Sequence, residues 1–346
     1  MELLESTLSP RRAELLARLA AERSFLLQQL EGLNEATLTH DSVFEGWTAA
    51  GLLAHLAYWD ALTADWLAKL ADGRPGDIRA AGVVDQPLDA RNAATQRHFA
   101  GEPFVQAVAL CQKERRGLLL ALGRLPDDTL HRRATLQPGW RATPADWLRR
   151  RHRHDAQHSV DLARWRKGYP ANDPVRRTIH RALLRPLLGL ARAEFLALAA
   201  LIPPGERETR PIEGDWSLKQ VLGHLSDYER LGVVALRQVA AGREPVYERT
   251  IEDFEGFNAE RGPVWAKLPW AEVWAQYVAT RRAMVEVALA LDDAALARLF
   301  TAPWLTPTTA GGYLLDMAGH EQEHADALRR ALGLRALPRR LGRANA

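Results

Sequence analysis

Cysteine is nearly missing from this 346-residue sequence: Cys111 is the only one, so no disulfide can form within the chain. No apolar run reaches the roughly 20 residues that a membrane-spanning helix needs. The opening residues 1–5 are acidic and do not have the basic and then apolar layout of a signal peptide. The sequence therefore predicts a protein of the reducing cytoplasm with no membrane partner.

Charge is almost balanced between the two signs. The chain has 46 Lys and Arg residues against 43 Asp and Glu residues, a formal net charge of +3. The pI near 9.2 reflects this small surplus and not a strongly basic surface. Nucleic acid is therefore not an expected partner. A Gly-rich phosphate loop, a G-x-S-x-G elbow and a C-x-x-C pair are all missing from the sequence.

Apolar residues make up 47% of the sequence and charged residues 26%, a balance typical of a soluble globular protein. A length of 346 residues exceeds one ordinary core and suits two domains of usual size. The 11 tryptophans are many for this length, and we expect most of them in helix–helix cores or in pocket walls.

The sequence contains an internal repeat. Trp47 precedes His55 by eight residues, and Trp216 precedes His224 by the same number. Further landmarks recur in the same order at offsets of 165 or 166 residues: Asn92-Ala93 with Asn258-Ala259, Arg115-Arg116 with Arg281-Arg282, Asp127-Asp128 with Asp292-Asp293, and His154 and His158 with His320 and His324. We therefore predict two copies of one domain, residues 1–168 and 175–346. The linker between them, 167–174, is rich in turn residues.

Helical signals dominate both copies. Ser9-Pro10, Thr48, Thr143-Pro144, Ser217 and Thr309 are helix starts with capping residues, and Ser217 with Gln220 has a capping-box pattern. We expect four long helices in each copy, with a longer connection between the second and the third. Pro186 should kink a helix or delay its start. Strand alternation is weak, and residues 129–137 are the one piece that reads as extended. The predicted fold class is all-α, two tandem four-helix bundles.

Six of the 11 histidines form one pattern that occurs twice. His154 and His158 are four residues apart on a predicted helix, so both rings project from the same face. His55, from the middle of the second helix, can join them inside a bundle. His224, His320 and His324 repeat the arrangement in the second copy. A lone helical histidine is more often a core or surface residue than a ligand, but the duplication favours a metal site in each copy.

Three imidazoles leave a coordination position open, which is typical of a catalytic metal site and not of a closed structural one. His152 lies two residues before His154, on a different face of the helix. The repeat pairs His154, not His152, with His320. We therefore interpret His152 as a surface residue beside the basic run 149–151.

The Trp–x7–His element followed by a distal H-x-x-x-H resembles the DinB-like superfamily, also called YfiT-like, once in each half of the chain. This resemblance implies four-helix bundles that bind a divalent metal ion, zinc or nickel. The ligands it implies are the six histidines His55, His154, His158, His224, His320 and His324. Members of the superfamily include thiol-dependent S-transferases and a hydrolase. Homodimers are common among them, so the two copies here are expected to pair as a dimer within one chain, or the chain to form a homodimer.

Three functions remain open at this point. The first is a metal-dependent enzyme, a thiol S-transferase or hydrolase acting on a small reactive compound, with a low-molecular-weight thiol as a further cofactor. The second is a non-enzymatic metal-binding stress-response protein. The third is a module that binds a small ligand in a Trp-lined pocket. No catalytic residue is assigned in any of them.

Other repeated residues have simpler interpretations. Asp60 and Glu229 follow the first histidine by five residues and are poorly placed as ligands, so we interpret them as solvated salt-bridge partners, with an acid or base role as the alternative. Trp59 and Tyr228 are four residues past that histidine and either line the metal pocket or pack in the core.

The repeated arginines Arg115, Arg116, Arg281 and Arg282 are interpreted as surface residues. An anion clamp for a carboxylate of a thiol cofactor or substrate is the alternative role. Cys111 stands where the other copy has Tyr277 and is interpreted as a small core residue.

Overall fold

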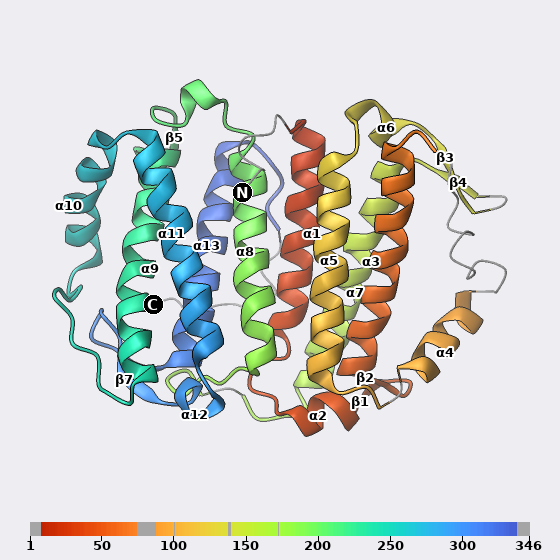
Figure 1. Cartoon of the computed structure of the whole chain (residues 1–346), viewed down its shortest axis with the longest axis horizontal. Coiled ribbons are helices and arrows are strands. Elements are labelled where there is room, and N and C mark those ends of the chain that lie inside the picture. Colours follow the sequence, from red (N-terminus) through yellow and green to blue (C-terminus); the bar gives the residue numbers. More distant parts are fainter. Residues whose placement is uncertain (1–7, 75–87, 100, 138–139, 172, 338–346) are drawn as a thin grey trace. The chain divides into compact units, whose positions relative to one another are not determined.

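A computed structural model of the chain describes residues 8–74, 88–99, 101–137, 140–171 and 173–337. It divides into two compact units, Met1–Pro170 (unit 1) and Ala171–Ala346 (unit 2). Both units are built from helices, with only short two-stranded hairpins among the described residues (Figure 1). The predicted all-α fold is therefore confirmed. Within the described ranges, no helix is both long enough and apolar enough to cross a membrane.

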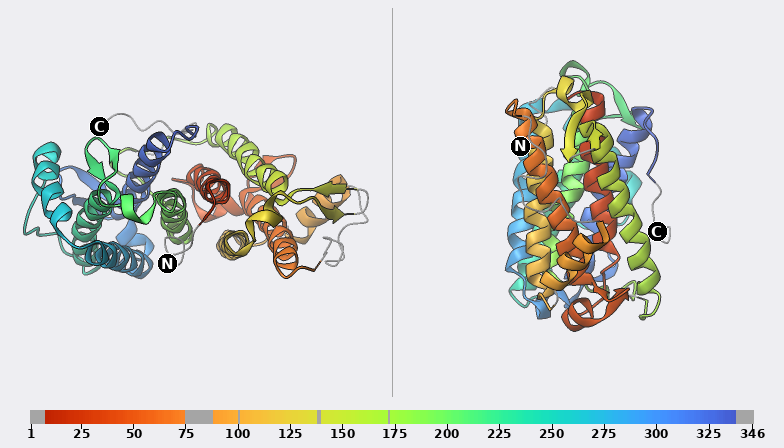
Figure 2. Two further views of the ribbon diagram at one scale, coloured as in Figure 1. Left: turned by 90° about the horizontal axis from the view of Figure 1, so that it is seen from above. Right: turned by 90° about the vertical axis from the view of Figure 1, so that its right-hand side faces the viewer.

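Unit 1 is a bundle of four long helices, seen end-on in Figure 2. They are α1 (Pro10–Gln28), α3 (Ala49–Ala71), α5 (Phe104–Arg124) and α7 (Pro144–Arg166). α3 packs mainly on α5, and α1 packs mainly on α7. Shorter helices connect them: α2 (Glu35–His40), α4 (Leu88–His98) and α6 (Asp127–His131). The core is filled by leucine, alanine and tryptophan side chains, of which Trp66 is the largest that is fully buried.

Unit 2 repeats this architecture with α8 (Leu184–Ala199), α9 (Leu218–Ala240), α11 (Trp270–Ala290) and α13 (Ala310–Ala331). Here α9 packs on α11, and α8 packs on α13. The connections contain η3 (Arg181–Leu183), η4 (Pro204–Glu206), α10 (Phe254–Lys267) and α12 (Asp293–Leu296). Pro186 lies in the first turn of α8, so the expected delay of the helix start is what the structure shows.

Each helix that carries a candidate histidine begins directly after a two-stranded antiparallel hairpin. The hairpins are β1 (Ser42–Phe44) with β2 (Trp47–Thr48), β3 (Ala134–Gln137) with β4 (Trp140–Ala142), β5 (Pro211–Glu213) with β6 (Trp216–Ser217), and β7 (Leu299–Thr301) with β8 (Pro307–Thr309). The register of the first hairpin is the same in both units, since Ser42 pairs with Thr48 and Pro211 with Ser217. The hairpin fixes where the helix starts and therefore how the histidines are oriented.

Local capping explains these starts. Thr48, Thr143 and Thr309 each accept a hydrogen bond at 3.0 Å from the backbone N–H three residues on. Ser217 and Gln220 form the predicted capping box of α9. The extended reading of residues 129–137 was only partly right, because α6 ends at His131 and the strand β3 begins at Ala134. The long connection between the second and third helices contains α4 in unit 1 and α10 in unit 2.

Candidate metal centres

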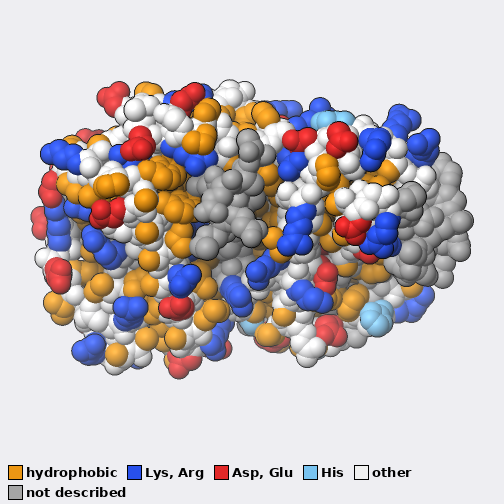
Figure 3. All heavy atoms as spheres, turned by 45° about the horizontal axis from the view of Figure 1, so that its top comes forward, with side chains coloured by type: hydrophobic (Ala, Val, Ile, Leu, Met, Phe, Trp, Pro, Cys, Tyr) orange, Lys and Arg blue, Asp and Glu red, His pale blue; other side chains and the backbone are white. Residues whose placement is uncertain are grey.

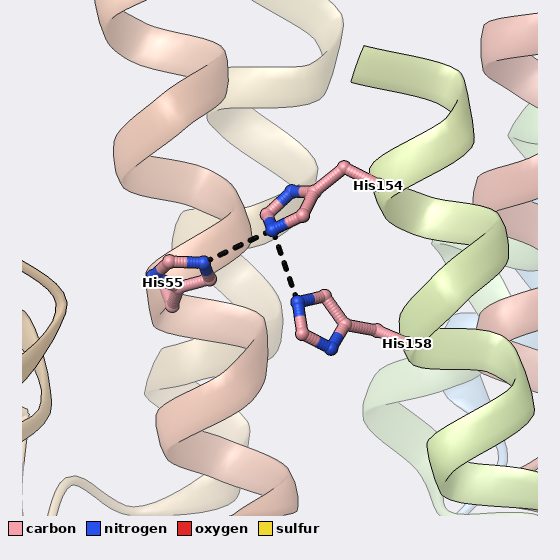
Figure 4. A group of neighbouring side chains, drawn as sticks. All are labelled: His55, His154 and His158. Carbon is pink, nitrogen blue, oxygen red and sulfur yellow. Dashed lines mark hydrogen bonds between the residues drawn. The ribbon is translucent and has the colours of Figure 1, made fainter. Parts of the chain in front are cut away.

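In unit 1 the structure brings His55 of α3 together with His154 and His158 of α7. The Nε2 atom of His154 lies 3.3 Å from Nε2 of His55 and 3.0 Å from Nε2 of His158. Figure 4 shows the three rings converging on the space between the two helices. His55 is buried, whereas His154 and His158 are half-buried.

Unit 2 brings the matching residues together in the same way, His224 from α9 with His320 and His324 from α13. The Nε2 atom of His320 lies 2.9 Å from Nε2 of His224 and 3.1 Å from Nε2 of His324. In both groups the ligand-capable atoms lie within 4.8 Å of one another. The predicted association of the three histidines in each copy is thus present in the structure.

The spacing of these nitrogens suits a metal ion. Zinc binds imidazole nitrogen at about 2.0–2.1 Å, and two ligands in tetrahedral positions then lie about 3.4 Å apart. The Nε2–Nε2 distances of 2.9–3.3 Å in the structure are close to that value. Three ring nitrogens that face one another so closely hold few protons between them. Their remaining lone pairs can be directed at one cation.

A carboxylate supports one histidine of each group from behind. Asp161 Oδ2 lies 3.1 Å from Nδ1 of His158, and Glu213 Oε2 lies 2.6 Å from Nδ1 of His324. A carboxylate accepts the Nδ1 proton and leaves the lone pair on Nε2, which is the usual arrangement around a metal-binding histidine. Asp161 comes from α7 itself, whereas Glu213 comes from β5. The repeat does not align these two acids, so the sequence comparison missed them.

Burial holds four of the histidines neutral, namely His55, His154, His158 and His224. Burial, together with the nearby rings of His158 and His324, lowers the pKa of His55 and of His224 to about 3. Burial also lowers the pKa values of His154 and His158. Neutral imidazole is the form that binds metal, so these rings do not have to lose a positive charge near neutral pH before an ion binds.

Aromatic side chains surround both groups. Trp47 and Trp216 contact the first histidine of each group edge-on, with ring centroids 5.1 and 5.2 Å apart. This contact gives the Trp–x7–His spacing a structural reason. Trp59 lies 6.4 Å from His55, whereas Tyr228 lies only 4.6 Å from His224. Both side chains are buried and also lie beside the histidines. Each of them therefore packs in the core and lines the metal site at the same time.

Behind the histidines of unit 1 lies a buried ion-pair cluster, formed by two arginines and two acids. Arg115 donates to Asp60 at 2.9 Å, to Asp155 at 2.6 Å and to the carbonyl of Leu19 at 3.2 Å. Arg23 donates to the same two carboxylates at 3.1 Å. All four charged side chains are at most 3% exposed, so the pairing satisfies charges that water cannot reach.

Unit 2 contains the same cluster at matching positions, with Arg192, Glu229, Arg281 and Glu321. Even the backbone acceptor is repeated, since Arg281 donates to the carbonyl of Leu188 at 3.2 Å. The sequence analysis missed Arg23 and Arg192, although their offset of 169 residues equals that between His55 and His224.

Several interpretations from the sequence are corrected here. Arg115 and Arg281 are buried and not on the surface, while their neighbours Arg116 and Arg282 are exposed. Both buried arginines are committed to protein carboxylates, which excludes them as an anion clamp for a ligand. Asp60 and Glu229 do form salt bridges, but buried ones and not solvated ones.

Two further residues differ from expectation. His152 is buried and not a surface residue, because α7 packs against α1 and places it near the charges of Glu14 and Arg18. It takes no part in the three-histidine group. Cys111 is buried as expected, but it also accepts a hydrogen bond from Arg23 at 2.8 Å.

The described part of unit 2 also has a cavity of about 300 Å³, lined by Arg249, Thr250, Ile251, Glu252, Asp253, Gly256, Phe257 and Glu260. None of the six histidines lines it. Its Phe257 contacts Tyr228, whose ring in turn lies 5.0 Å from His320.

Positive and negative side chains are interspersed on the face drawn in Figure 3, in keeping with the balanced charge.

Comparison with known proteins identifies the family. The sequence profile of the DinB superfamily matches residues 9–159 and 187–328, one match in each unit. The chain therefore belongs to the DinB superfamily, as the Trp–x7–His and H-x-x-x-H elements predicted.

A solved structure of a histidine-to-alanine mutant of mycothiol-dependent maleylpyruvate isomerase is similar to part of the chain. It shares 21% identity at a TM-score of 0.36, over 52% of this chain and 68% of that one. No curated protein matches the chain significantly.

Proposed function

We propose that this chain is a metal-dependent enzyme of the DinB superfamily, with one divalent ion, zinc or nickel, held by three histidines in each unit. The observation that carries the proposal is the convergence of three imidazoles, twice, with a carboxylate behind one of them. Superfamily membership supports the same conclusion. The reaction proposed is thiol transfer to, or hydrolysis of, a small reactive compound.

The residues around each group define what the chain contributes. His55, His154 and His158 would hold the ion in unit 1, and His224, His320 and His324 in unit 2. A bound divalent ion with a free coordination position lowers the pKa of a water or thiol bound to it. Trp47 and Trp216 restrict the ring of the first ligand, and the aromatic neighbours keep one side of the site apolar.

Substrate access is possible from the side of the half-buried histidines. His154, His158 and His320 are partly exposed, whereas His55 and His224 are buried against the helix bundle. A site with one solvent-facing side suits a reaction with a small diffusing compound better than a purely structural ion does. In unit 2 the Tyr228 hydroxyl, whose pKa burial raises to about 12, stays neutral beside the site and donates a hydrogen bond to Oδ1 of Asn258 at 3.4 Å.

A structural metal ion is the second candidate, because each three-histidine group joins two different helices, α3 with α7 and α9 with α13. An ion bound only by the folded state stabilises it in proportion to the logarithm of its concentration. Such a protein would bind the ion without turning over a substrate.

The deciding experiment pairs a metal-dependent activity assay with thermal melting. Zinc- and nickel-loaded protein is assayed for transfer of low-molecular-weight thiols to electrophiles and for hydrolysis of small esters and amides. The proposal predicts activity that chelation removes while the protein stays folded. Loss of the folded state on chelation, with no activity in any loaded form, would instead establish the structural role.

A further inference from the structure

One position next to the histidines breaks the symmetry of the two units. Arg151 lies three residues before His154 on α7, and Met317 lies three residues before His320 on α13. Both side chains are buried. Unit 1 therefore has a guanidinium where unit 2 has an uncharged thioether.

The guanidinium of Arg151 is fixed against His154. Its Nη2 atom is in direct contact with Nδ1 of His154. The same guanidinium lies 5.2 Å from the ring centre of Trp59 and 5.7 Å from that of Trp147. Cation–π contacts with two indoles hold the charge in place and prevent it from swinging into solvent.

The contact determines which nitrogen of His154 carries the proton. A guanidinium can only donate, so Nδ1 of His154 accepts, and the neutral ring then carries its proton on Nε2. Nε2 is the atom that faces the other two histidines. A metal ion on that atom would require the proton to move to Nδ1. The Nδ1–H group and the guanidinium of Arg151 would then face each other as two donors. His158 and His324 have the opposite arrangement, with a carboxylate at Nδ1.

Charge acts in the same direction. Around the histidines of unit 1, the three arginines Arg23, Arg115 and Arg151 are balanced by three acids, Asp60, Asp155 and Asp161. Unit 2 has only two arginines, Arg192 and Arg281, for the three acids Glu213, Glu229 and Glu321, so the surroundings of unit 1 are more positive by one charge. A positive charge in a buried environment repels a divalent cation more strongly than one in water does.

From this difference we infer that the two metal sites are unequal: unit 2 binds a divalent ion first and tightly, and Arg151 weakens the site of unit 1. The inference rests on the proposed metal function. It makes Arg151 a residue that sets metal affinity through His154, without being a ligand itself. At limiting metal the chain would hold one ion, and at excess metal two.

The test uses zinc competition with a chromophoric chelator on the full-length chain. H324A leaves the unit 1 group intact, and H158A leaves the unit 2 group intact. We expect H158A to bind zinc at least about tenfold more tightly than H324A. Residues that contact metal ligands typically change metal affinity by a factor of this size. Adding R151M to H324A should raise its zinc affinity by that factor. Adding M317R to H158A should lower its zinc affinity by the same factor.

The matched control is R153M, which removes the same charge from an exposed position two residues further along α7. It should leave zinc affinity unchanged, because water and salt screen an exposed charge. Nitrogen-15 NMR of the histidine rings gives a readout that needs no metal and no Arg151 variant. In the metal-free protein, His154 should carry its proton on Nε2, while His158 and His324 carry theirs on Nδ1.

The outcomes separate the two proposals. Equal zinc affinities for H158A and H324A, or a His154 proton on Nδ1, would overturn the inference and leave the metal function standing. An R151M variant that folds but binds no more tightly would do the same. If neither single variant nor the wild-type chain binds zinc or nickel, the proposed function itself fails.

Discussion

At the scale of single residues, the group that contacts Nδ1 of a histidine determines whether Nε2 carries the proton or a free lone pair. Asp161 and Glu213 occupy the same role in the two units but come from different elements, α7 and β5. Two unrelated sequence positions thus provide the same electrostatic support. This convergence within one chain indicates that the Nδ1 carboxylate matters to the site and is not left over from the duplication.

Removing these carboxylates should weaken the metal sites. Asp161→Ala should lower the metal affinity of unit 1, and Glu213→Ala that of unit 2, by about 10- to 100-fold. The physical reason is that the ring loses both its fixed orientation and part of its basicity. Chelator competition in the single-site backgrounds measures the effect. Asp65→Ala is the control, since this acid pairs with Lys69 on the surface of α3, and a comparable loss there would speak against a local cause.

The pKa shifts of the histidines predict how the metal-free protein responds to acid. Burial lowers the pKa of His55 and His224 to about 3, while in the unfolded chain the value is near 6.5. Below pH 6.5 the unfolded chain takes up protons that the folded chain refuses. Stability is therefore fully present above pH 6.5 and is lost as the pH falls towards 3, at up to about 1.4 kcal/mol per pH unit for each histidine.

Urea unfolding at a series of pH values measures this loss. His55→Ala should make the decline shallower by about one proton, because the variant no longer has that ring to protonate on unfolding. The exposed His131 is the matched control, and His131→Ala should leave the slope as it is. An unchanged slope in His55→Ala would show that this ring is already charged in the folded protein.

At the scale of elements, each of the two buried ion-pair clusters joins the four long helices of its unit behind the histidines. Arg115 of α5 connects α3 through Asp60, α7 through Asp155 and α1 through the carbonyl of Leu19. Two of these helices, α3 and α7, carry the three histidines of unit 1. The cluster therefore fixes the relative positions of the helices on which the metal site depends.

Breaking one partner of the cluster should be costly. Arg115→Leu leaves Asp60 and Asp155 buried with an incomplete set of partners, and Arg281→Leu does the same to Glu229 and Glu321. We expect each to lower the free energy of unfolding by about 3–5 kcal/mol. Chemical denaturation measures the loss.

The chain offers a control one residue away. Arg116→Leu and Arg282→Leu change the same residue type at exposed positions and should alter stability by less than about 0.5 kcal/mol. If the buried and the exposed arginine variants lost similar amounts of unfolding free energy, the buried ion pairs would contribute no more to stability than the exposed arginines do.

Element boundaries set by local chemistry could be predicted from the sequence. Thr48, Thr143, Ser217 and Thr309 mark helix starts because a capping side chain bonds to the backbone only three residues away. α10 was not predicted, because Pro263 lies inside it and the segment has no clear apolar stripe. The association of the six histidines could be predicted because their pattern occurs twice.

What could not be predicted depends on contacts between distant segments. Arg115 and Arg281 read as surface residues because their type is usually exposed, and only the fold shows the acids that bury them. Likewise, only the fold shows that Glu213 reaches His324, which lies 111 residues further along the chain. Arg151 and Asp161, in contrast, lie three residues from His154 and His158 on the same helix, so helical spacing alone could have indicated their contacts.

At the scale of the whole molecule, the chain consists of two compact units with a turn-rich segment near their boundary at Pro170. Limited proteolysis should cut first between residues 168 and 174, because turn-rich linkers between domains are the most accessible backbone. Mass spectrometry of the early fragments locates the cut. First cleavage inside one of the long helices would argue against a separable linker.

The central claim is that each unit holds one metal ion on its three histidines. Metal content by mass spectrometry, after zinc loading and removal of free ion, tests it in four proteins: wild type, H158A, H324A and the double variant. His152→Ala is the control, since this buried residue lies outside the histidine group and its loss should leave the metal content unchanged. The account predicts two, one, one and no ions per chain at saturating zinc. A wild-type chain that holds no zinc, or a double variant that keeps both ions, would contradict it.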